Sequence, residues 1–310
     1  MEAYDIDYKK TGIISEVERY AINDGPGIRT VIFLKGCPLR CSWCANPETH
    51  IVQKQLMYWQ TRCIGCKECI RACPQKALIW DSGYGVCIDR NRCVACGQCV
   101  RSCNSEALTI AGEEMSVSEV LNIIRKDELF YKTSGGGVTF SGGEAMQQVD
   151  FLCEIAKASK SAGIHTCIET SGHAPWQSFQ KLLPYIDLFL FDIKLMDDTK
   201  HKKYTGVSNE LILNNFASLV AIGASVNTRL PIIPGVNDSD ENIIDTISFL
   251  KKNGKNNHVS LLPYHRLGTS KYEKLGIPYG LIETMPPREE AMQHIASCFE
   301  KNGFSVTIGE

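Results

Sequence analysis

The sequence predicts an α/β fold, a partial (β/α)6 barrel of the TIM type with a small cysteine-rich domain inserted into it. Two observations predict the barrel. Short β-rich segments alternate with helical segments, which is typical of parallel strands joined by crossover helices, and polar residues follow several of the strand segments. A third observation, two dense runs of cysteines between residues 53 and 112, predicts the insert. A doubly wound sheet is the main structural alternative.

Six β-rich segments are expected to form the parallel strands. They are Thr30–Lys35, Gly137–Ser141, His165–Thr170, Leu188–Lys194, Ser225–Ile232 and His258–Pro263. The helical segments between them are Ser116–Tyr131, Gln147–Ala162, Asn209–Ile222 and Ser239–Asn253. Ser116 and Glu119 have the spacing of a capping box. A last helix near Glu289–Lys301 and a strand at Phe304–Ile308 fall outside the six units and are placed at the edge of the barrel.

The composition is that of an ordinary soluble protein, with 44% hydrophobic residues among 310 and a formal net charge of -2. Without a basic excess we expect no nucleic-acid partner, and no apolar run approaches the length of a membrane span. Residues 1–10 are polar and acidic and do not resemble a signal peptide, so we expect a cytoplasmic protein. Fifteen cysteines in a reducing compartment favour metal or catalytic roles over disulfides and indicate an anaerobic setting.

The insert, assigned to residues 53–112, carries two cysteine runs with two, two and three residues between successive cysteines. The first run is Cys63, Cys66, Cys69 and Cys73, and the second is Cys93, Cys96, Cys99 and Cys103. This is the spacing of bacterial ferredoxins, in which the fourth cysteine of each run ligates the other of two 4Fe-4S clusters. We therefore expect Cys103 to complete the first cluster and Cys73 the second. Residues 1–52 and 113–310 are assigned to the barrel.

Zinc is the alternative for the insert, because paired cysteines also bind zinc, although zinc sites usually separate their two pairs by a longer spacer. Cys87 lies outside both runs and is either an alternative ligand or a small apolar residue. The cysteines at positions 153, 167 and 298 fall on predicted helices or on a strand and are interpreted as core residues.

A separate cysteine loop, Cys37-Pro-Leu-Arg-Cys41-Ser-Trp-Cys44, follows the first strand. Three thiolates can hold three irons of a four-iron cluster and leave the fourth open to bind a small molecule and pass it an electron. The loop is therefore expected to carry chemistry at a cluster. Its spacing, with Trp43 before the third cysteine, resembles the signature of the radical S-adenosylmethionine (SAM) enzymes.

With Asp24-Gly-Pro-Gly-Ile-Arg29 just before the first strand, nearly the whole chain resembles the glycyl-radical enzyme activating enzymes, relatives of pyruvate formate-lyase activating enzyme. The insert is similar to that of the longer members, which serve diol dehydratases, choline lyase, arylacetate decarboxylases and hydroxyproline dehydratase. The resemblance implies an oxidoreductase of the EC 1.97.1.- type. It would cleave SAM reductively to methionine and a 5'-deoxyadenosyl radical, which takes a hydrogen from a backbone glycine of a partner glycyl radical enzyme.

The resemblance also implies the cofactors and the contacts of the site. The cofactors are three 4Fe-4S clusters, one SAM-binding and two auxiliary, SAM itself and a monovalent cation, and flavodoxin or ferredoxin is the electron donor. By matching position, the SAM-binding cluster would be ligated by Cys37, Cys41 and Cys44. The residues expected to contact SAM are Trp43, Gly142, Gly143, Glu144, Lys194, Arg229 and His265. The cation would be held by Glu169 and Asp192, and Asp24 would meet the glycine loop near the partner's C-terminus. The family more often has Asp at the Glu169 position, which puts the cation site in doubt.

Several of these residues also have a purely structural interpretation. The glycines before Glu144 also suit a tight turn, Asp192 and Lys194 also suit an ion pair at a strand end, and a lone histidine such as His265 is more often structural. Asp24 also suits a turn before Gly25-Pro26.

Two other functions remain open from the sequence. One is a different radical SAM reaction on a small molecule or peptide. The other is a non-catalytic iron-sulfur electron carrier, for which the insert alone would suffice but which leaves the three-cysteine loop and the barrel without a role.

Overall fold

The computed structural model describes residues 5–253 and 257–309. Its main sheet has nine strands in the order β13-β12-β11-β10-β9-β8-β2-β1-β7. The strands are β1 (Thr11–Ala21), β2 (Arg29–Leu34), β7 (Glu113–Ser116), β8 (Gly137–Gly142), β9 (His165–Thr170), β10 (Leu188–Asp192), β11 (Val226–Ile232), β12 (His258–Pro263) and β13 (Ser305–Ile308). From β2 through β13 all neighbours are parallel, whereas β1 is antiparallel to both β2 and β7. The parallel strands follow chain order without a reversal, so the sheet is not doubly wound.

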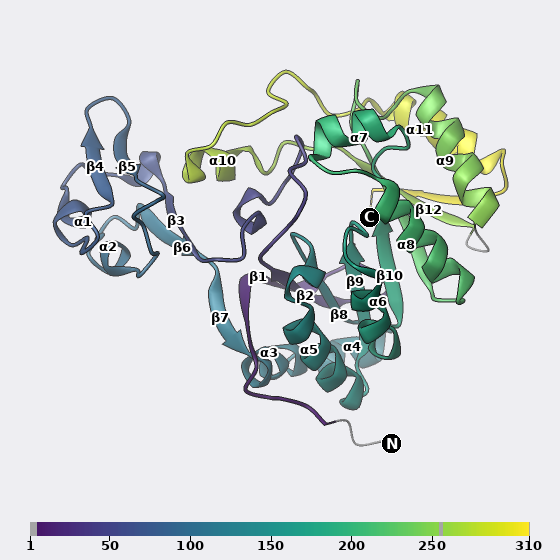
Figure 1. Cartoon of the computed structure of the whole chain (residues 1–310), viewed down its shortest axis with the longest axis horizontal. Helices are drawn as coiled ribbons and strands as arrows, with labels where there is room; N and C mark the ends of the chain where they lie inside the picture. The colour runs from purple at the N-terminus through teal and green to yellow at the C-terminus, as the bar shows by residue number, and fades with distance from the viewer. Residues whose placement is uncertain (1–4, 254–256, 310) are drawn as a thin grey trace.

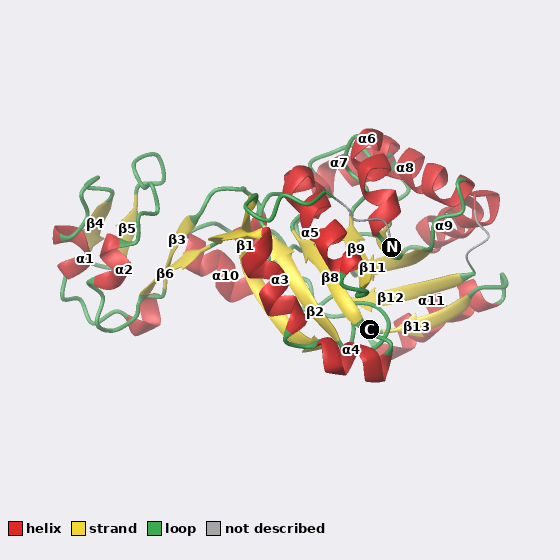
Figure 2. Cartoon of the chain, turned by 90° about the horizontal axis from the view of Figure 1, so that it is seen from below, coloured by secondary structure: helices red, strands yellow, loops and turns green. Residues whose placement is uncertain are grey.

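Helices follow most of the parallel strands and lie around the outside of the sheet (Figure 1, Figure 2). They are α3 (Val117–Arg125), α4 (Glu128–Ser134), α5 (Val149–Ser161), α6 (Trp176–Leu182), α7 (Asp198–Thr205), α8 (Glu210–Ala221), α9 (Asp240–Asn253), α10 (Thr269–Leu275) and α11 (Glu289–Glu300). None of the helices in the described ranges is long and apolar enough to span a membrane.

The six predicted strands are all present, and the expected last strand forms β13 at the edge of the sheet. Two strands that the sequence did not predict, β1 and β7, extend the other edge. In β1 buried and exposed residues alternate only at its start, because the rest of the strand is largely solvent-exposed.

The helix predicted over Ser116–Tyr131 is wrong as one element, because the chain breaks between α3 and α4 at Asp127. The buried Asp127 carboxylate accepts hydrogen bonds from Arg19 Nε (2.9 Å) and Thr30 Oγ1 (2.7 Å), which tie this break to β1 and β2. The capping box at Ser116 is confirmed, since its side chain accepts from the Glu119 amide and the Glu119 carboxylate accepts from the Ser116 amide.

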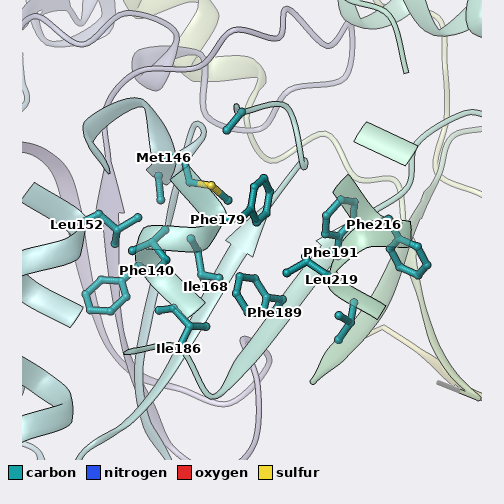
Figure 3. Close-up of a cluster of buried hydrophobic side chains, with 14 of the residues drawn as sticks. Phe140, Met146, Leu152, Ile168, Phe179, Ile186, Phe189, Phe191, Phe216 and Leu219 are labelled. Carbon is teal, nitrogen blue, oxygen red and sulfur yellow. The ribbon is translucent and has the colours of Figure 1, made fainter. Parts of the chain in front are cut away.

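The apolar core lies between the sheet and its covering helices (Figure 3). Phe191 of β10 packs edge-to-face against Phe216 of α8, with ring centroids 5.3 Å apart, and Phe179 of α6 lies against Phe189. Burying one such side chain contributes about 1.5–3 kcal/mol. This packing fixes the parallel strands, and with them the loops at their carboxyl ends.

The cysteine-rich insert forms a separate lobe beside the main sheet (Figure 1). Its elements are β3 (Gln55–Tyr58) paired antiparallel with β6 (Leu108–Ala111), β4 (Leu78–Asp81) paired antiparallel with β5 (Gly85–Ile88), and the short helices α1 (Glu68–Arg71) and α2 (Gln98–Arg101). It contacts α10, where Arg90 Nη2 donates to the Leu275 carbonyl (2.7 Å) and the Tyr84 hydroxyl donates to the Glu273 carbonyl (3.2 Å). A groove of about 1120 Å³ lies along this contact.

Candidate active site

The carboxyl ends of the parallel strands, from β2 through β13, surround a cavity of about 340 Å³. Most of the residues that the sequence assigned to the site line it. They are Cys37, Cys41, Trp43 and Cys44 after β2, Gly142 and Gly143 at the end of β8, Glu169 in β9, Asp192 and Lys194 at the end of β10, Arg229 in β11 and His265 after β12. These ends meet because parallel strands connected by crossover helices all point their carboxyl ends to the same side.

Neighbouring helices hold the three-cysteine loop in place. The Arg40 amide donates to the Thr205 carbonyl at the end of α7 (2.7 Å), and the Tyr272 hydroxyl of α10 donates to the Cys44 carbonyl (3.0 Å). Within the loop the Cys44 amide donates to the Cys41 carbonyl (3.0 Å). The loop is therefore fixed from both ends by groups that the sequence analysis did not single out.

Burial raises the pKa of the loop thiols, to about 12 for Cys37 and Cys41 and to about 11 for Cys44. The buried Glu144 carboxyl raises the pKa of Cys37 further, and Lys194 opposes the shift at each thiol. Thiols of this kind become thiolates when a bound metal supplies positive charge. Three convergent thiols with no disulfide partner fit the ligand set of an iron-sulfur cluster.

The glycines after β8 bring the backbone against the cysteine loop. A Cβ atom at Gly142, where φ is +118°, would overlap the Leu34 carbonyl, and one at Gly143 would overlap the Gly36 carbonyl. The Gly143 amide instead donates to the Leu34 carbonyl (3.1 Å). Any larger residue would push the turn away from the cysteines.

Glu144 does not line the cavity. It is fully buried, and its carboxylate accepts hydrogen bonds from Thr170 Oγ1 (3.0 Å), the Ser171 amide (2.9 Å) and Ser171 Oγ (2.6 Å). Burial raises its pKa, while these hydrogen bonds lower it. The structure therefore places Glu144 behind the wall of the cavity, where it joins the turn after β8 to the end of β9 instead of pointing toward a ligand. The sequence alone could not predict this position of Glu144, because the direction of its side chain depends on the backbone conformation at Gly142.

Two carboxylates and two cations lie together at one side of the cavity. Lys194 Nζ donates to Asp192 Oδ2 (2.8 Å), Arg229 forms an ion pair with Glu169, and Ser141 Oγ also donates to Glu169. Burial lowers the pKa of Lys194, but Asp192 and nearby thiols more than offset this effect, so the net shift is upward. In this structure the two predicted cation ligands are thus already neutralised by protein side chains.

Asp24 lies against this group of charges. Burial and the adjacent Glu169 carboxyl raise the pKa of Asp24 to about 7. The fully buried Arg29 holds the loop by donating to the Pro26 carbonyl (2.9 Å) and to Thr139 Oγ1 (2.6 Å). The sequence predicts no role for Arg29 itself, and only its position at the start of β2 could have indicated one.

Eight of the nine cysteines of the insert, all but Cys87, fall into two groups. The Cys69 thiol interacts electrostatically with those of Cys103, Cys63 and Cys66. A small cavity is lined by Cys73, Cys93, Cys96 and Cys99; the Cys99 thiol interacts with the other three and also with Cys69 of the first group. The fourth cysteine of each run therefore lies with the first three of the other run. Across residues 5–253 and 257–309 no three His, Cys, Asp or Glu side chains converge as closely as a single metal ion requires.

Comparison with known proteins identifies the family. The model of the radical SAM superfamily matches residues 31–247. The chain is 47% identical over 300 residues to the trans-4-hydroxy-L-proline dehydratase activating enzyme of Clostridioides difficile, covering 96% of this chain and 99% of that protein. The chain belongs to the radical SAM glycyl-radical enzyme activating enzymes. It is therefore an oxidoreductase, and its family uses a 4Fe-4S cluster and SAM.

Other relatives of this chain are also activating enzymes by name. The chain is 42% identical to the (2S)-3-sulfopropanediol dehydratase activating enzyme of Klebsiella oxytoca, covering 96% of this chain and 97% of that protein. It is 39% identical to the choline trimethylamine-lyase activating enzyme of Oleidesulfovibrio alaskensis, covering 97% and 98%. A radical SAM methyltransferase from Sphaerobacter thermophilus shares the fold, with a TM-score of 0.53 and 15% identity over 90% of this chain and 66% of that one.

Proposed function

We propose that this activating enzyme installs the glycyl radical of a partner dehydratase, lyase or decarboxylase, and not that of pyruvate formate-lyase. The names of its relatives support this partner class. The observation that carries the chemistry is the single cavity in which three cysteine thiols, Lys194 and Arg229 meet at the strand ends. This sheet, a partial barrel in our proposal, leaves the cavity accessible to a partner.

The cluster held by the three-cysteine loop would supply one electron to SAM, whose cleavage gives the 5'-deoxyadenosyl radical that takes a hydrogen from the partner's glycine. The residues of the chain bind and orient SAM. Lys194 would hold the SAM carboxylate by a charge-assisted hydrogen bond. The backbone of Gly142 and Gly143, not the Glu144 carboxylate, would face the methionine amino group.

The remaining contacts follow the walls of the cavity. Arg229 and His265 would lie along the nucleoside together with Trp43. The loop at Asp24, which lies beside Glu169, would receive the partner's glycine loop. A monovalent cation beside Glu169 and Asp192 would have to compete with Arg229 and Lys194 for the same carboxylates.

We further propose that residues 53–112 form a ferredoxin-like domain with two auxiliary 4Fe-4S clusters, one at each cysteine group. The exchange of the fourth cysteines, Cys73 and Cys103, between the two runs supports this assignment, because it is the arrangement of two-cluster ferredoxins. Flavodoxin or ferredoxin would supply the electrons.

The test is to incubate the anaerobically reconstituted, reduced protein with SAM and trans-4-hydroxy-L-proline dehydratase, a first partner chosen from its relative. We expect 5'-deoxyadenosine and a glycyl radical signal in electron paramagnetic resonance (EPR). A Cys37→Ala, Cys41→Ala, Cys44→Ala variant is the control and should give neither. A protein with full iron and sulfide content that yields no 5'-deoxyadenosine with any partner of the three classes would overturn the proposal in favour of an electron carrier.

A further inference from the structure

The insert contains two halves that repeat one another in sequence. When the first cysteine run is aligned on the second, Cys63 falls on Cys93 and Cys73 on Cys103. In each half an alanine and a leucine follow at the same distance. Two nearby positions break the repeat, since Tyr58 aligns with Ile88, five residues before the run, and Ser105 aligns with Gln75, two residues after it.

Tyr58 is the first of these departures. Its side chain is buried, and within the described ranges its hydroxyl group has no hydrogen-bond partner. Cys63 packs against the buried cluster that contains Tyr58, and the hydroxyl interacts with the Cys63 thiol and the Val86 backbone. Gly85 makes room for it, because any Cβ atom at that position would overlap the Tyr58 oxygen. A buried hydroxyl without a partner is costly, so its position beside a cluster ligand requires an explanation.

Ser105 is the second departure. Its Oγ atom lies 3.6 Å from the sulfur of Cys103, close enough for a hydrogen bond to sulfur. The backbone around the fourth cysteine is the same in both halves, because the Ala107 amide donates to Cys103 and the Ala77 amide donates to Cys73, each at 3.3 Å. The difference between the halves is therefore confined to side chains.

Both hydroxyl groups act on the same group of cysteines, although they come from opposite halves of the repeat. Cys63 and Cys103 lie together, because the fourth cysteine of each run joins the other group. At the second group the matching positions hold Ile88, which has no donor, and Gln75, which is exposed and lines the small cavity of that group but has no hydrogen bond to a cysteine in the described part of the chain.

We propose that the hydroxyl groups of Tyr58 and Ser105 donate hydrogen bonds to the thiolate ligands at Cys63 and Cys103 and hold the reduction potential of that cluster above the potential of its neighbour. The physical reason is that a reduced cluster carries one more negative charge, so donors to its sulfur ligands stabilise it more than the oxidised cluster. This inference rests on the proposed function only in requiring that the insert holds two 4Fe-4S clusters.

The experiment is a redox titration of the two auxiliary clusters, followed by EPR, in the variant that lacks Cys37, Cys41 and Cys44. That background removes the signal of the SAM-binding cluster. We expect two separate one-electron steps. Tyr58→Phe and Ser105→Ala should each shift the upper step downward by about tenfold in the reduction equilibrium constant, the weight of one hydrogen bond, which is about 59 mV. Gln75→Ala, the matched control beside the other group of cysteines, should leave the upper step in place.

The possible outcomes distinguish a failure of this inference from a failure of the two-cluster assignment on which it rests. Iron and sulfide contents below those of two four-iron clusters in this background would refute the two-cluster assignment itself. Full contents with a single unresolved step, or with an upper step that neither hydroxyl variant moves, would overturn the role of Tyr58 and Ser105. A Tyr58→Phe variant that keeps its full iron content excludes misfolding as the cause of a shift.

Discussion

Arg229 on β11 pairs with Glu169 on β9 across the intervening strand β10, and its Nε atom lies 3.8 Å from Asp192 Oδ1 on that strand. The Arg229 and Glu169 side chains are only 13% and 18% exposed. A single guanidinium group thus neutralises carboxylates from two strands at the floor of the candidate active site. Removing one partner of a buried pair leaves an uncompensated charge.

The first prediction concerns this pair. Arg229→Met should lower the free energy of unfolding by about 3–5 kcal/mol, because Glu169 and Asp192 then lose their shared cation. The double variant Arg229→Met, Glu169→Leu should lose clearly less free energy of unfolding than the sum of the losses in the two single variants. Anaerobic urea unfolding measures all three. Strictly additive losses would show that the two side chains are not coupled.

Lys194 is expected to carry much of the affinity for SAM. Lys194→Ala should weaken SAM binding about 10- to 100-fold, since a hydrogen bond to a charged group is worth about 1.5–3 kcal/mol. Anaerobic equilibrium dialysis measures this change. Lys181→Ala, which removes a surface lysine paired with Asp150 (3.2 Å), is the control and should bind SAM normally. Unchanged affinity in the Lys194 variant would exclude the proposed carboxylate contact.

Glu144 is expected to act on the fold and not on SAM. Glu144→Gln should lower the free energy of unfolding by about 1–3 kcal/mol, because donors on Thr170 and Ser171 lose a charged acceptor. Its affinity for SAM should fall far less than that of Lys194→Ala. If Glu144→Gln lost as much SAM affinity as Lys194→Ala without losing stability, this result would support the direct contact between Glu144 and SAM that the sequence predicts.

The close approach at Gly143 can be tested against a glycine in open space. Gly143→Ala should cost about 1–3 kcal/mol from overpacking and should lower the iron content of the three-cysteine loop, because the added methyl group meets the Gly36 carbonyl. Gly223→Ala also costs stability, since φ is +78° there, but no atom lies within 4 Å of its Cβ position. Its iron content should therefore match the wild type. Equal iron in both variants would contradict the prediction.

His201 should make stability depend on pH. It is buried in α7, Nδ1 lies 2.7 Å from the Val207 carbonyl, and burial lowers its pKa. The unfolded chain therefore takes up a proton first as the pH falls below about 6.5, so the free energy of unfolding decreases from that point downward. His201→Gln should flatten the curve in urea unfolding between pH 5 and 7. An unchanged slope in the variant would assign the effect to other groups.

Much of the fold was predictable because periodicity and burial agree in the parallel strands. β1 was missed because only three of its eleven residues are buried, so its pattern is weak. The break at Asp127 depends on Arg19 and Thr30, which are distant in sequence.

The site shows the same division between local and distant determinants. Strand ends indicated which loops would meet, and the structure brings Cys37, Lys194 and Arg229 to one cavity. The direction of Glu144 could not be predicted, because it depends on a positive φ at Gly142 and on hydrogen bonds donated by Thr170 and Ser171 at the end of β9.

The cysteine-rich insert leaves and returns through neighbouring residues, since Gln55 of β3 is paired with Ala111 of β6. A chain excursion whose two ends are side by side can be gained or lost in a single genetic event, because a short turn closes the gap and the parallel strands keep their order. The cysteine-rich lobe is in this sense a removable module, and removing it need not alter the order of the parallel strands.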